Sequence, residues 1–390
     1  MSPLAGWSAV LNTELLNHDA ENHYCEGAAR LQLGAGFFRP ESRPSRDLAV
    51  LLARLLGQDR PLHLLDVMAG CGIRSLRVGL EAGAAGVWAN DADADRQGLL
   101  QTNLAVLSAQ GCRVRRTASP AKQLLAECLL ERQRFELVDL DAFGCPTALL
   151  PLVLEAVAFD GVLYLASTDG RSPTGHDRVA ALRHLGAAAR AHPASWELAL
   201  RLQLGSIARA AWTLGRGVVP WLSFSEGRTF RTAVQLCRRP AQEEERQLGL
   251  MALCHGCGDQ QVQSLLQLRR WAPCRCGSAA PLAVSGPLWI GPLQQRATLA
   301  RLEGLADDAV DPGTSRLLTQ LQADPGLPAR CWPIAEIGRR LGMGPPPLAG
   351  LVDALEQQGY TAVVSGVMPG QLRSDAPWAL ILELAGHCCC

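Results

Sequence analysis

The sequence contains a single lysine, Lys122, and few aromatic residues, which make up 5% of the chain. Its 37 basic and 37 acidic residues cancel, so the overall charge does not favour a polyanionic partner, and a nucleic-acid surface would have to be a local patch. Nearly every cation is therefore an arginine, whose planar guanidinium suits phosphate oxygens and base edges, although a coding bias would produce the same composition.

Long apolar runs are also absent. Met1 to Asn12 has no basic stretch followed by an apolar one, and the most apolar segment, 148–166, is interrupted by Glu155 and Asp160. We therefore expect no signal peptide and no membrane span. Fourteen cysteines without an export signal favour reduced thiols and a metal site over a disulfide framework. We expect a cytoplasmic protein, which we take to be a monomer.

The length of 390 residues, with 48% hydrophobic and 19% charged residues, is enough for two globular domains. From residue 62 to 167, short apolar runs alternate with longer amphipathic ones, which is typical of a doubly wound α/β fold with a parallel sheet. We predict strands at 62–67, 86–90, 113–115, 135–140 and 161–167, and helices at 73–82, 93–109, 121–131 and 146–158.

Further along the chain, we predict a long helix at 196–214 and a hairpin of strands at 217–224 and 229–236. The polar stretch 238–246 predicts a linker. We therefore expect three parts, namely an N-terminal segment (1–61), a Rossmann-like core (62–237) and a smaller α+β C-terminal domain (247–390). Within the last part, residues 333–360 have a helix-turn-helix rhythm.

The turn after the first predicted strand indicates a ligand site. Asp66 ends the strand, and Gly70 and Gly72 precede the helix that carries Arg74. Glycines let the backbone approach a ligand, and a helix N-terminus offers free N–H groups. The G-x-G-x-x-G pattern of dinucleotide sites is incomplete, since Ser75 fills the place of its third glycine. The preceding acid favours a cationic ligand such as a sulfonium cofactor, although an ordinary strand–helix turn has the same pattern.

A second acid, Asp91, directly follows the next predicted strand. A carboxylate there can accept hydrogen bonds from both hydroxyls of a ribose. Asp66 and Asp91 together predict a nucleoside-type site at the carboxyl ends of adjacent strands, and structural capping of the strand ends is the alternative.

A third acidic motif, Asp139 to Pro146, ends the fourth predicted strand. An exocyclic amine is a poor nucleophile, so an enzyme that methylates one needs acceptors that hold its N–H bonds and orient the nitrogen. We expect Asp141 to accept these hydrogen bonds and to remove a proton as charge develops. Phe143 is then positioned to stack on an extruded base. A strand end capped by two acids remains the structural alternative.

Four cysteines in two pairs, Cys254, Cys257, Cys274 and Cys276, predict a structural Zn²⁺ site with no open coordination position. The second pair has C-x-C spacing instead of the commoner C-x-x-C. Chance pairing is the alternative.

Several stretches together resemble the tRNA guanine-26 N2-dimethyltransferase family over essentially the whole chain. Their order and spacing are more specific than any one of them. The matching stretches are 26–29, 45–50, 66–74, 90–91, 139–144, 167–169, 223–227, 230–231, 276–278, 286–293 and 374–377.

The resemblance implies S-adenosyl-L-methionine as cofactor. Arg46, from an N-terminal segment folded over the cofactor, and Arg74 would lie near its methionine carboxylate, with Asp66 at the glycine turn and Asp91 at the ribose. The family has an acidic residue followed by alanine where this chain has Ser119-Pro120-Ala121, so Ala121 and the backbone are expected to contact the adenine.

For the substrate, the resemblance implies N2-methylation or dimethylation of a guanine in tRNA, at position 26. Asp141 and Phe143 would contact that base, and the C-terminal domain would help to hold tRNA. Ser45 and Ala142 replace the family's Asn and Pro, which puts the choice between mono- and dimethylation in question. Alternative functions are methylation of another guanine in tRNA or ribosomal RNA, a non-catalytic zinc-containing RNA-binding protein and, least well matched, a nicotinamide oxidoreductase.

Overall fold

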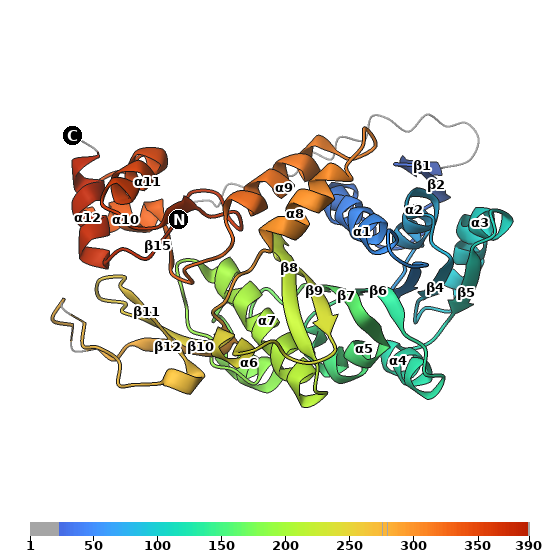
Figure 1. The fold of residues 1–390 in the computed structure, drawn as a ribbon, viewed down its shortest axis with the longest axis horizontal. Helices are drawn as coiled ribbons and strands as arrows, with labels where there is room; N and C mark the ends of the chain where they lie inside the picture. Colours follow the sequence, from blue (N-terminus) through green and yellow to red (C-terminus); the bar gives the residue numbers. More distant parts are fainter. Residues whose placement is uncertain (1–22, 275, 279, 389–390) are drawn as a thin grey trace, which may run out of the picture.

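Seven strands form the central sheet of the computed structural model, which describes residues 23–274, 276–278 and 280–388 (Figure 1). The strands are β3 (His63–Asp66), β4 (Gly86–Asn90), β5 (Arg113–Thr117), β6 (Phe135–Ala142), β7 (Val157–Ser167), β8 (Gly217–Glu226) and β9 (Thr229–Cys237). Their order is β5-β4-β3-β6-β7-β9-β8; the first five are parallel, and β9 is antiparallel to both neighbours. The predicted α/β class and the predicted hairpin are confirmed.

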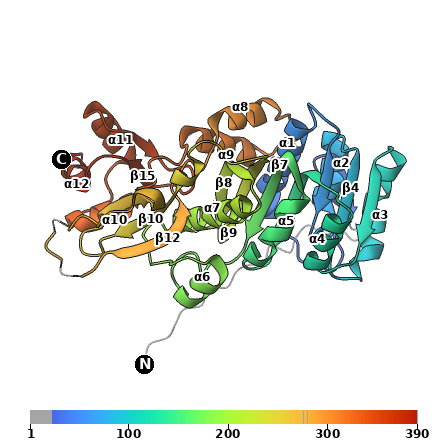
Figure 2. The same ribbon diagram turned by 60° about the horizontal axis from the view of Figure 1, so that its bottom comes forward.

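Helices cover both faces of this sheet (Figure 2). Leu48, Leu76 and Leu104 belong to the core on one face, and Leu124, Val153 and Leu204 belong to the core on the other. The first face carries α1 (Arg43–Leu56), α2 (Ile73–Ala82) and α3 (Arg96–Ala109); the second carries α4 (Ala121–Leu130), α5 (Leu150–Ala156) and α7 (Ser195–Thr213), while α6 (Arg178–Leu185) precedes α7.

Two predicted helices have different bounds in the structure. The helix expected from residue 93 starts at Arg96, because the carboxylate of Asp93 accepts a hydrogen bond from the N–H of Asp95 and holds a turn there. The helix expected over 146–158 is a short 3-10 turn, η2 (Pro146–Leu149), followed by α5. It ends early because the Arg216 guanidinium donates to the carbonyls of Leu154 and Val157, and β7 begins at Val157.

The C-terminal half contains two small sheets. The first has the order β11-β10-β12, and the second, β13-β15-β14, packs with three helices around a core that includes stacked Trp332 and Trp378. The elements are η3 (Glu244–Gln247), β10 (Leu248–Leu253), β11 (Gln260–Ser264), η4 (Leu265–Gln267), β12 (Ala283–Trp289), α8 (Arg296–Gly304), α9 (Pro312–Ala323), β13 (Cys331–Pro333), α10 (Ile334–Leu341), α11 (Leu348–Gln357), β14 (Ala362–Val364), β15 (Gln371–Ser374) and α12 (Trp378–His387). Helices α10 and α11 match the predicted helix-turn-helix rhythm.

The C-terminal half packs closely on the Rossmann-like core. Leu299 of α8 and Leu318 of α9 belong to the same hydrophobic core as α1, and Figure 1 shows both helices beside α1. The polar stretch expected to be a linker is anchored as well, because buried Glu244 accepts hydrogen bonds from Trp212 Nε1 and Val218 N.

No helix among the described residues is both long and apolar enough to cross a membrane. The expectation of no signal peptide concerns Met1 to Asn12, which lie outside the described residues. An N-terminal hairpin of β1 (His23–Glu26) and β2 (Ala29–Gln32), followed by η1 (Pro40–Ser42), leads into α1.

Candidate functional site

The loop between β3 and α2 exposes backbone to a cavity. Gly70 and Gly72 have positive φ angles of 57° and 80°, a conformation that favours glycine. A Cβ at Gly70 would meet no atom within 4 Å, so a ligand can approach the backbone there. A Cβ at Gly72 would lie 2.9 Å from Leu100 Cδ2, so this glycine allows the turn to pack on α3.

A cavity of about 580 Å³ lies at the carboxyl ends of the central parallel strands. Its walls come from the N-terminal segment, the loop after β3, the ends of β4 and β6, and the β8–β9 turn. The sequence-predicted residues that line it are Arg46, Gly70, Arg74, Asp91, Asp141 and Phe143. Three other predicted residues, Asp66, Gly72 and Ala121, are not among the residues described as its lining.

Asp91 belongs to this wall and holds the glycine loop. Its Oδ2 accepts a hydrogen bond from Gly70 N at 2.9 Å, and its Oδ1 accepts one from Asp93 N at 3.0 Å. Each carboxylate oxygen has two lone pairs, so both oxygens can accept one further donor. Asp91 can therefore bind the two hydroxyls of a ribose without releasing the loop.

Asp66 lies behind the loop and is buried. Its Oδ2 accepts a hydrogen bond from Ser75 Oγ at 2.8 Å, which links the end of β3 to α2. Burial and the nearby charge of Asp139 raise the pKa of Asp66 to about 7. In this structure Asp66 stabilises the turn from its buried side, through the hydrogen bond with Ser75.

Asp141 lies between two arginines. Arg74 Nη1 is 2.6 Å and Arg231 Nη2 is 2.9 Å from Asp141 Oδ2, so neither of these contacts uses Oδ1. Burial alone would raise the pKa of Asp141, but the charges of Arg74 and Arg231 hold it well below its usual range. The carboxylate is therefore ionised at neutral pH and acts as a hydrogen-bond acceptor.

The register of the sheet produces this arrangement. Asp141 of β6 pairs with Ala166 of β7, and Ala166 pairs with Arg231 of β9. Side chains in one row across a sheet point to the same face, and two strand spacings are about 9.5 Å, which an arginine and an aspartate can span together.

Arg74 lies against two acidic side chains. Its Nε is buried 3.4 Å from Asp139 Oδ2 and, within the described structure, makes no hydrogen bond of good geometry. Both carboxylate oxygens of Asp139 are also buried and, among the described residues, accept no hydrogen bond of good geometry. Because Nε is buried beside Asp139 and Nη1 contacts Asp141, only the remaining N–H groups of Arg74 are left for an anionic ligand in the cavity, such as a carboxylate.

Two aromatic side chains stand at the cavity mouth. Phe143 is 77% exposed and Phe37 is 72% exposed, and their ring centroids are 6.0 Å apart with an interplanar angle of 70°. The guanidinium of Arg39 lies 5.4 Å from the centre of the Phe37 ring. Exposed rings at this spacing offer an apolar surface to a planar ligand.

The loop that carries Phe143 is fixed to the end of β7. Gly144 has a φ of 75°; its N–H donates to Thr168 Oγ1 at 2.7 Å, and its carbonyl accepts from Ser167 Oγ at 2.9 Å. These bonds set the loop conformation although Ala142 stands at the position of the expected proline.

Arg46 reaches the cavity wall with its charge already paired. Its Nε lies 2.7 Å from Glu26 Oε1, and the guanidinium also donates to the carbonyls of Arg39 and Pro40. Glu26 is shared with buried Arg77, whose Nη1 is 2.8 Å away. Arg46 therefore holds the N-terminal hairpin over the cavity. Both Arg46 and Arg74 line the cavity, and each is already paired with a carboxylate of the protein.

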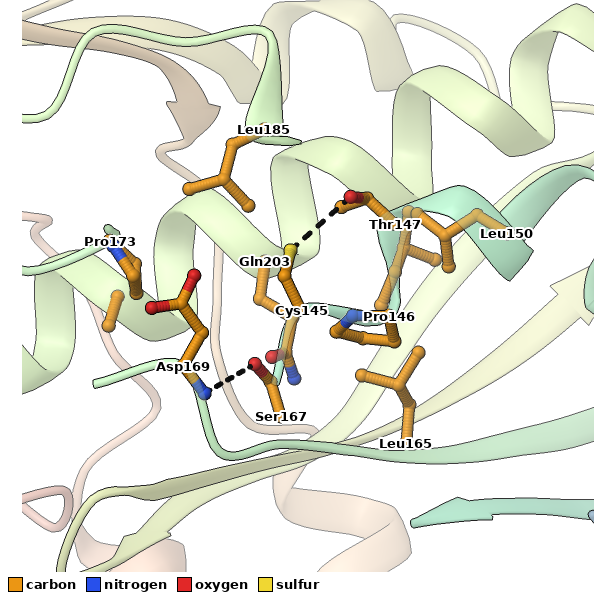
Figure 3. A pocket seen from close by; sticks show the side chains of 12 residues that line it. Cys145, Pro146, Thr147, Leu150, Leu165, Ser167, Asp169, Pro173, Leu185 and Gln203 are labelled. Atoms are coloured by element: carbon orange, nitrogen blue, oxygen red, sulfur yellow. Dashed lines mark hydrogen bonds between the residues drawn. The ribbon is translucent and has the colours of Figure 1, made fainter. Parts of the chain in front are cut away.

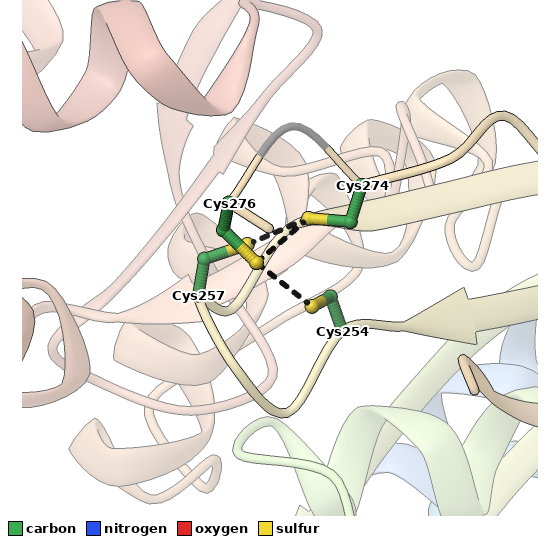
Figure 4. Close-up of side chains that lie close together, drawn as sticks. All are labelled: Cys254, Cys257, Cys274 and Cys276. Carbon is green, nitrogen blue, oxygen red and sulfur yellow. Dashed lines mark hydrogen bonds between the residues drawn. The ribbon is translucent and has the colours of Figure 1, made fainter. Parts of the chain in front are cut away.

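Four thiols converge in the C-terminal half (Figure 4). The Sγ atoms of Cys254, Cys257, Cys274 and Cys276 all lie within 4.8 Å of one another. Neighbouring pairs are 3.2, 3.3 and 3.7 Å apart, too long for disulfides and close to the roughly 3.8 Å between ligands of a tetrahedral zinc–thiolate site. The donor set fits Zn²⁺, and the predicted cluster could hold this ion.

Much of the wall was not predicted from the sequence, including Arg231 and Phe37. Arg231 lies in a stretch that matched a family pattern without a role, and Phe37 carried no motif of its own. Both come from segments distant from the glycine loop in sequence, so only the fold shows that they share its cavity.

A family model described as N2,N2-dimethylguanosine tRNA methyltransferase matches residues 31–385. Among curated proteins, the tRNA (guanine(26)-N(2))-dimethyltransferase of Thermococcus kodakarensis is 27% identical over 92% of this chain and 94% of that protein. The enzyme of the same description from Methanocorpusculum labreanum is 29% identical over 89% of both. Among solved structures, Trm1 from Pyrococcus horikoshii in complex with S-adenosyl-L-methionine matches with a TM-score of 0.81 and 25% identity, covering 93% of this chain and 99% of that one.

Proposed function

The chain belongs to the N2,N2-dimethylguanosine tRNA methyltransferase family, and we propose that it transfers methyl groups from S-adenosyl-L-methionine to the exocyclic N2 of guanine 26 in tRNA. The observation that carries the proposal is the position of Asp141. This ionised carboxylate and the exposed backbone of Gly70 line the same cavity. A hydrogen-bond acceptor for the guanine amine and the loop that would bind the cofactor therefore share one cavity.

The cavity wall supports the cofactor assignment. Gly70 offers accessible backbone, Asp91 offers two carboxylate oxygens to ribose hydroxyls, and Arg74 places a guanidinium on the cavity wall for a carboxylate. When bound, S-adenosyl-L-methionine supplies an electrophilic methyl group on a sulfonium. A cavity of about 580 Å³ has ample room for a nucleoside ligand of this size beside a base.

Asp141 would orient the guanine amine. Its Oδ2 is held by Arg74 and Arg231, which leaves Oδ1 to accept an N–H bond from N2 and to aim the nitrogen lone pair at the methyl carbon. The amine becomes strongly acidic once it carries the methyl group, so a carboxylate of depressed pKa can still take its proton.

Phe143 and Phe37 would receive the base once it has left the RNA stack. Their rings are exposed and stand at the mouth through which a nucleotide must enter. Stacking on an aromatic ring contributes about 1–3 kcal/mol per base, which offsets part of the cost of removing the base from the RNA stack. A second round of the same reaction would add the second methyl.

The test is methyl transfer from labelled S-adenosyl-L-methionine to an unmodified tRNA transcript, followed by nucleoside analysis. We expect N2-methylguanosine and N2,N2-dimethylguanosine with the intact transcript and no label in a matched transcript with adenine at position 26. Label that persists in the adenine-26 transcript would move the activity to another guanine. Cofactor binding without any label would contradict the enzymatic assignment.

A further inference from the structure

A second group of possible metal ligands lies outside the cysteine cluster. Cys145 follows β6, Asp169 follows β7, and His184 is in the last turn of α6. One ligand atom from each residue lies within 4.8 Å of the other two. Cys145 and Asp169 are half-buried, and His184 is exposed, so the group is open to ions on one side.

We propose that Cys145, Asp169 and His184 form a metal site with a preference for Zn²⁺. A thiolate, an imidazole and a carboxylate are the ligands that zinc uses in proteins. Ligand atoms around tetrahedral zinc are roughly 3.2–3.8 Å apart, so the three side chains need only small rotations to close on an ion. The fourth coordination position is left for water. Cys145 gives up its thiol proton to solvent when the metal binds.

Hydrogen bonds from neighbouring groups already orient Asp169. One oxygen of Asp169 accepts the N–H groups of Arg171 and Ser172 at 3.1 and 3.0 Å, which leaves its other oxygen for an ion. Thr147 Oγ1 donates its one hydrogen to the carbonyl of His184 at 2.6 Å, so the thiol of Cys145, 3.3 Å away, is the donor to Thr147 and releases this bond when it is deprotonated. Outer bonds such as those to Asp169 orient metal ligands and raise affinity.

The space beside the ligands supports the site. Cys145 and Asp169 line a small cavity of about 10 Å³, close to the volume of one water-sized particle, and the rest of its lining is largely apolar (Figure 3). A largely apolar wall has a low dielectric constant, which strengthens the attraction of a cation to a carboxylate and a thiolate.

The position of the site indicates what a bound ion would do. Cys145 is two residues after Phe143, and Gly144 between them is bonded to Ser167 and Thr168 at the end of β7. An ion shared with His184 would fasten this loop to α6 as well. The metal would restrain the candidate substrate loop, and its binding does not require cofactor or RNA.

The experiment is a Co²⁺ titration of the full-length protein after it has been loaded with a single equivalent of Zn²⁺. A site with four thiolates binds zinc more tightly than a site with one, so the single equivalent occupies the cysteine cluster with a spectroscopically silent ion and leaves the second site for cobalt. We expect one equivalent of Co²⁺ to bind, with a near-ultraviolet sulfur-to-cobalt absorption band of one thiolate.

Substitutions assign the ligands. Cys145→Ser should abolish the band, and His184→Ala should weaken Co²⁺ binding at least tenfold. The matched controls Cys237→Ser and His387→Ala should leave both band and affinity unchanged. A band that survives Cys145→Ser, or binding that is unaffected by His184→Ala, would overturn the proposal.

Discussion

Arg231 Nη2 lies 2.9 Å from Asp141 Oδ2, although the two residues are 90 positions apart in the chain. They belong to β9 and β6, and the intervening β7 places Ala166 between them in the same row of the sheet. The antiparallel hairpin of β8 and β9, at one edge of the sheet, therefore contributes a cation to the parallel part of the sheet. Asp141, the candidate hydrogen-bond acceptor for the guanine amine, lies in that part.

Replacement of Asp141 by Asn should remove turnover and spare cofactor binding. The variant keeps the shape of the side chain and loses the charge that holds the amine and takes its proton. We expect kcat for tRNA methylation to fall roughly 10²- to 10⁴-fold, with the Kd for S-adenosyl-L-methionine within about threefold of wild type by calorimetry. Methylation at the wild-type rate would show that Asp141 is not the acceptor; exposed Asp95→Asn is the control.

Arg231→Gln should make the reaction more sensitive to acid. The pKa of Asp141 is held low by two arginines, and removal of one raises it towards the ordinary value. Because the ionised form is required, the acidic limb of kcat/KM against pH should move to higher pH, and kcat at neutral pH should fall roughly 10- to 100-fold through loss of orientation. An unchanged acidic limb would mean that Arg231 has only a structural role.

Asp91→Ala should weaken cofactor binding. The substitution removes two acceptors for ribose hydroxyls and the partner of Gly70 N. Hydrogen bonds to a charged group contribute about 1.5–3 kcal/mol, so the Kd should rise roughly 10- to 100-fold. Asp95→Ala, on an exposed residue of the same segment, should bind normally. Equal affinity in both variants would remove Asp91 from the cofactor site.

Removal of zinc from the cysteine cluster should destabilise the C-terminal half. Ligand thiolates that converge without a metal repel one another, and metal affinity is part of the folding free energy of such sites. We expect a chelator to lower the Tm of the wild type and to have little further effect on Cys257→Ser, whose Tm should already be low. Cys237→Ser should behave as wild type, and a chelator-insensitive Tm in the wild type would argue against the ion.

Arg373→Met should be one of the most destabilising single changes. Its buried guanidinium lies 2.7 Å from Glu197 of α7 and 2.7 Å from Asp324, and loss of one partner leaves buried charges uncompensated, at a cost of about 3–5 kcal/mol. Chemical denaturation measures this, with exposed Arg339→Met expected to have little effect. A loss no larger than that of the control would contradict the structural role.

The same ion-pair network should make the free energy of unfolding depend on pH. Although burial alone would raise the pKa of Glu197, Arg373 and Arg201 lower it to about 2, from an ordinary value of 4.5. A carboxyl whose pKa is depressed by folding stabilises the fold above its unfolded pKa, and this contribution is lost as the pH falls from about 4.5 towards 2. In Glu197→Gln this part of the pH dependence of unfolding should disappear.

The fold could be read from the sequence where local patterns suffice. Alternating apolar and amphipathic runs predicted the parallel core, and acids at strand ends predicted Asp91 and Asp141 at one edge, because parallel strands end on the same side of a sheet. Helix bounds failed where a distant side chain intervened, as Arg216 does at the end of α5.

The rest of the site depends on long-range pairing. The place of Arg231 follows from the register of β9 against β7, and the partner of Arg46 is Glu26 on a separate hairpin. Neither relation has a local signature. Asp66 differs from these two residues, because its place at the end of a strand was evident from the sequence. Its burial behind the glycine loop, bonded to Ser75, depends on packing that the sequence does not show.

The burial of Asp47 has a consequence for synthesis of the chain. Its Oδ2 accepts hydrogen bonds from Asp311 N and Thr314 Oγ1, the latter 267 residues later in the chain. A ribosome needs on the order of tens of seconds to make that length. During this interval Asp47 of α1, the neighbour of Arg46 on the cavity wall, lacks two of its native donors. A nascent chain that has completed the central sheet therefore still lacks α9, which fixes α1 beneath the N-terminal hairpin.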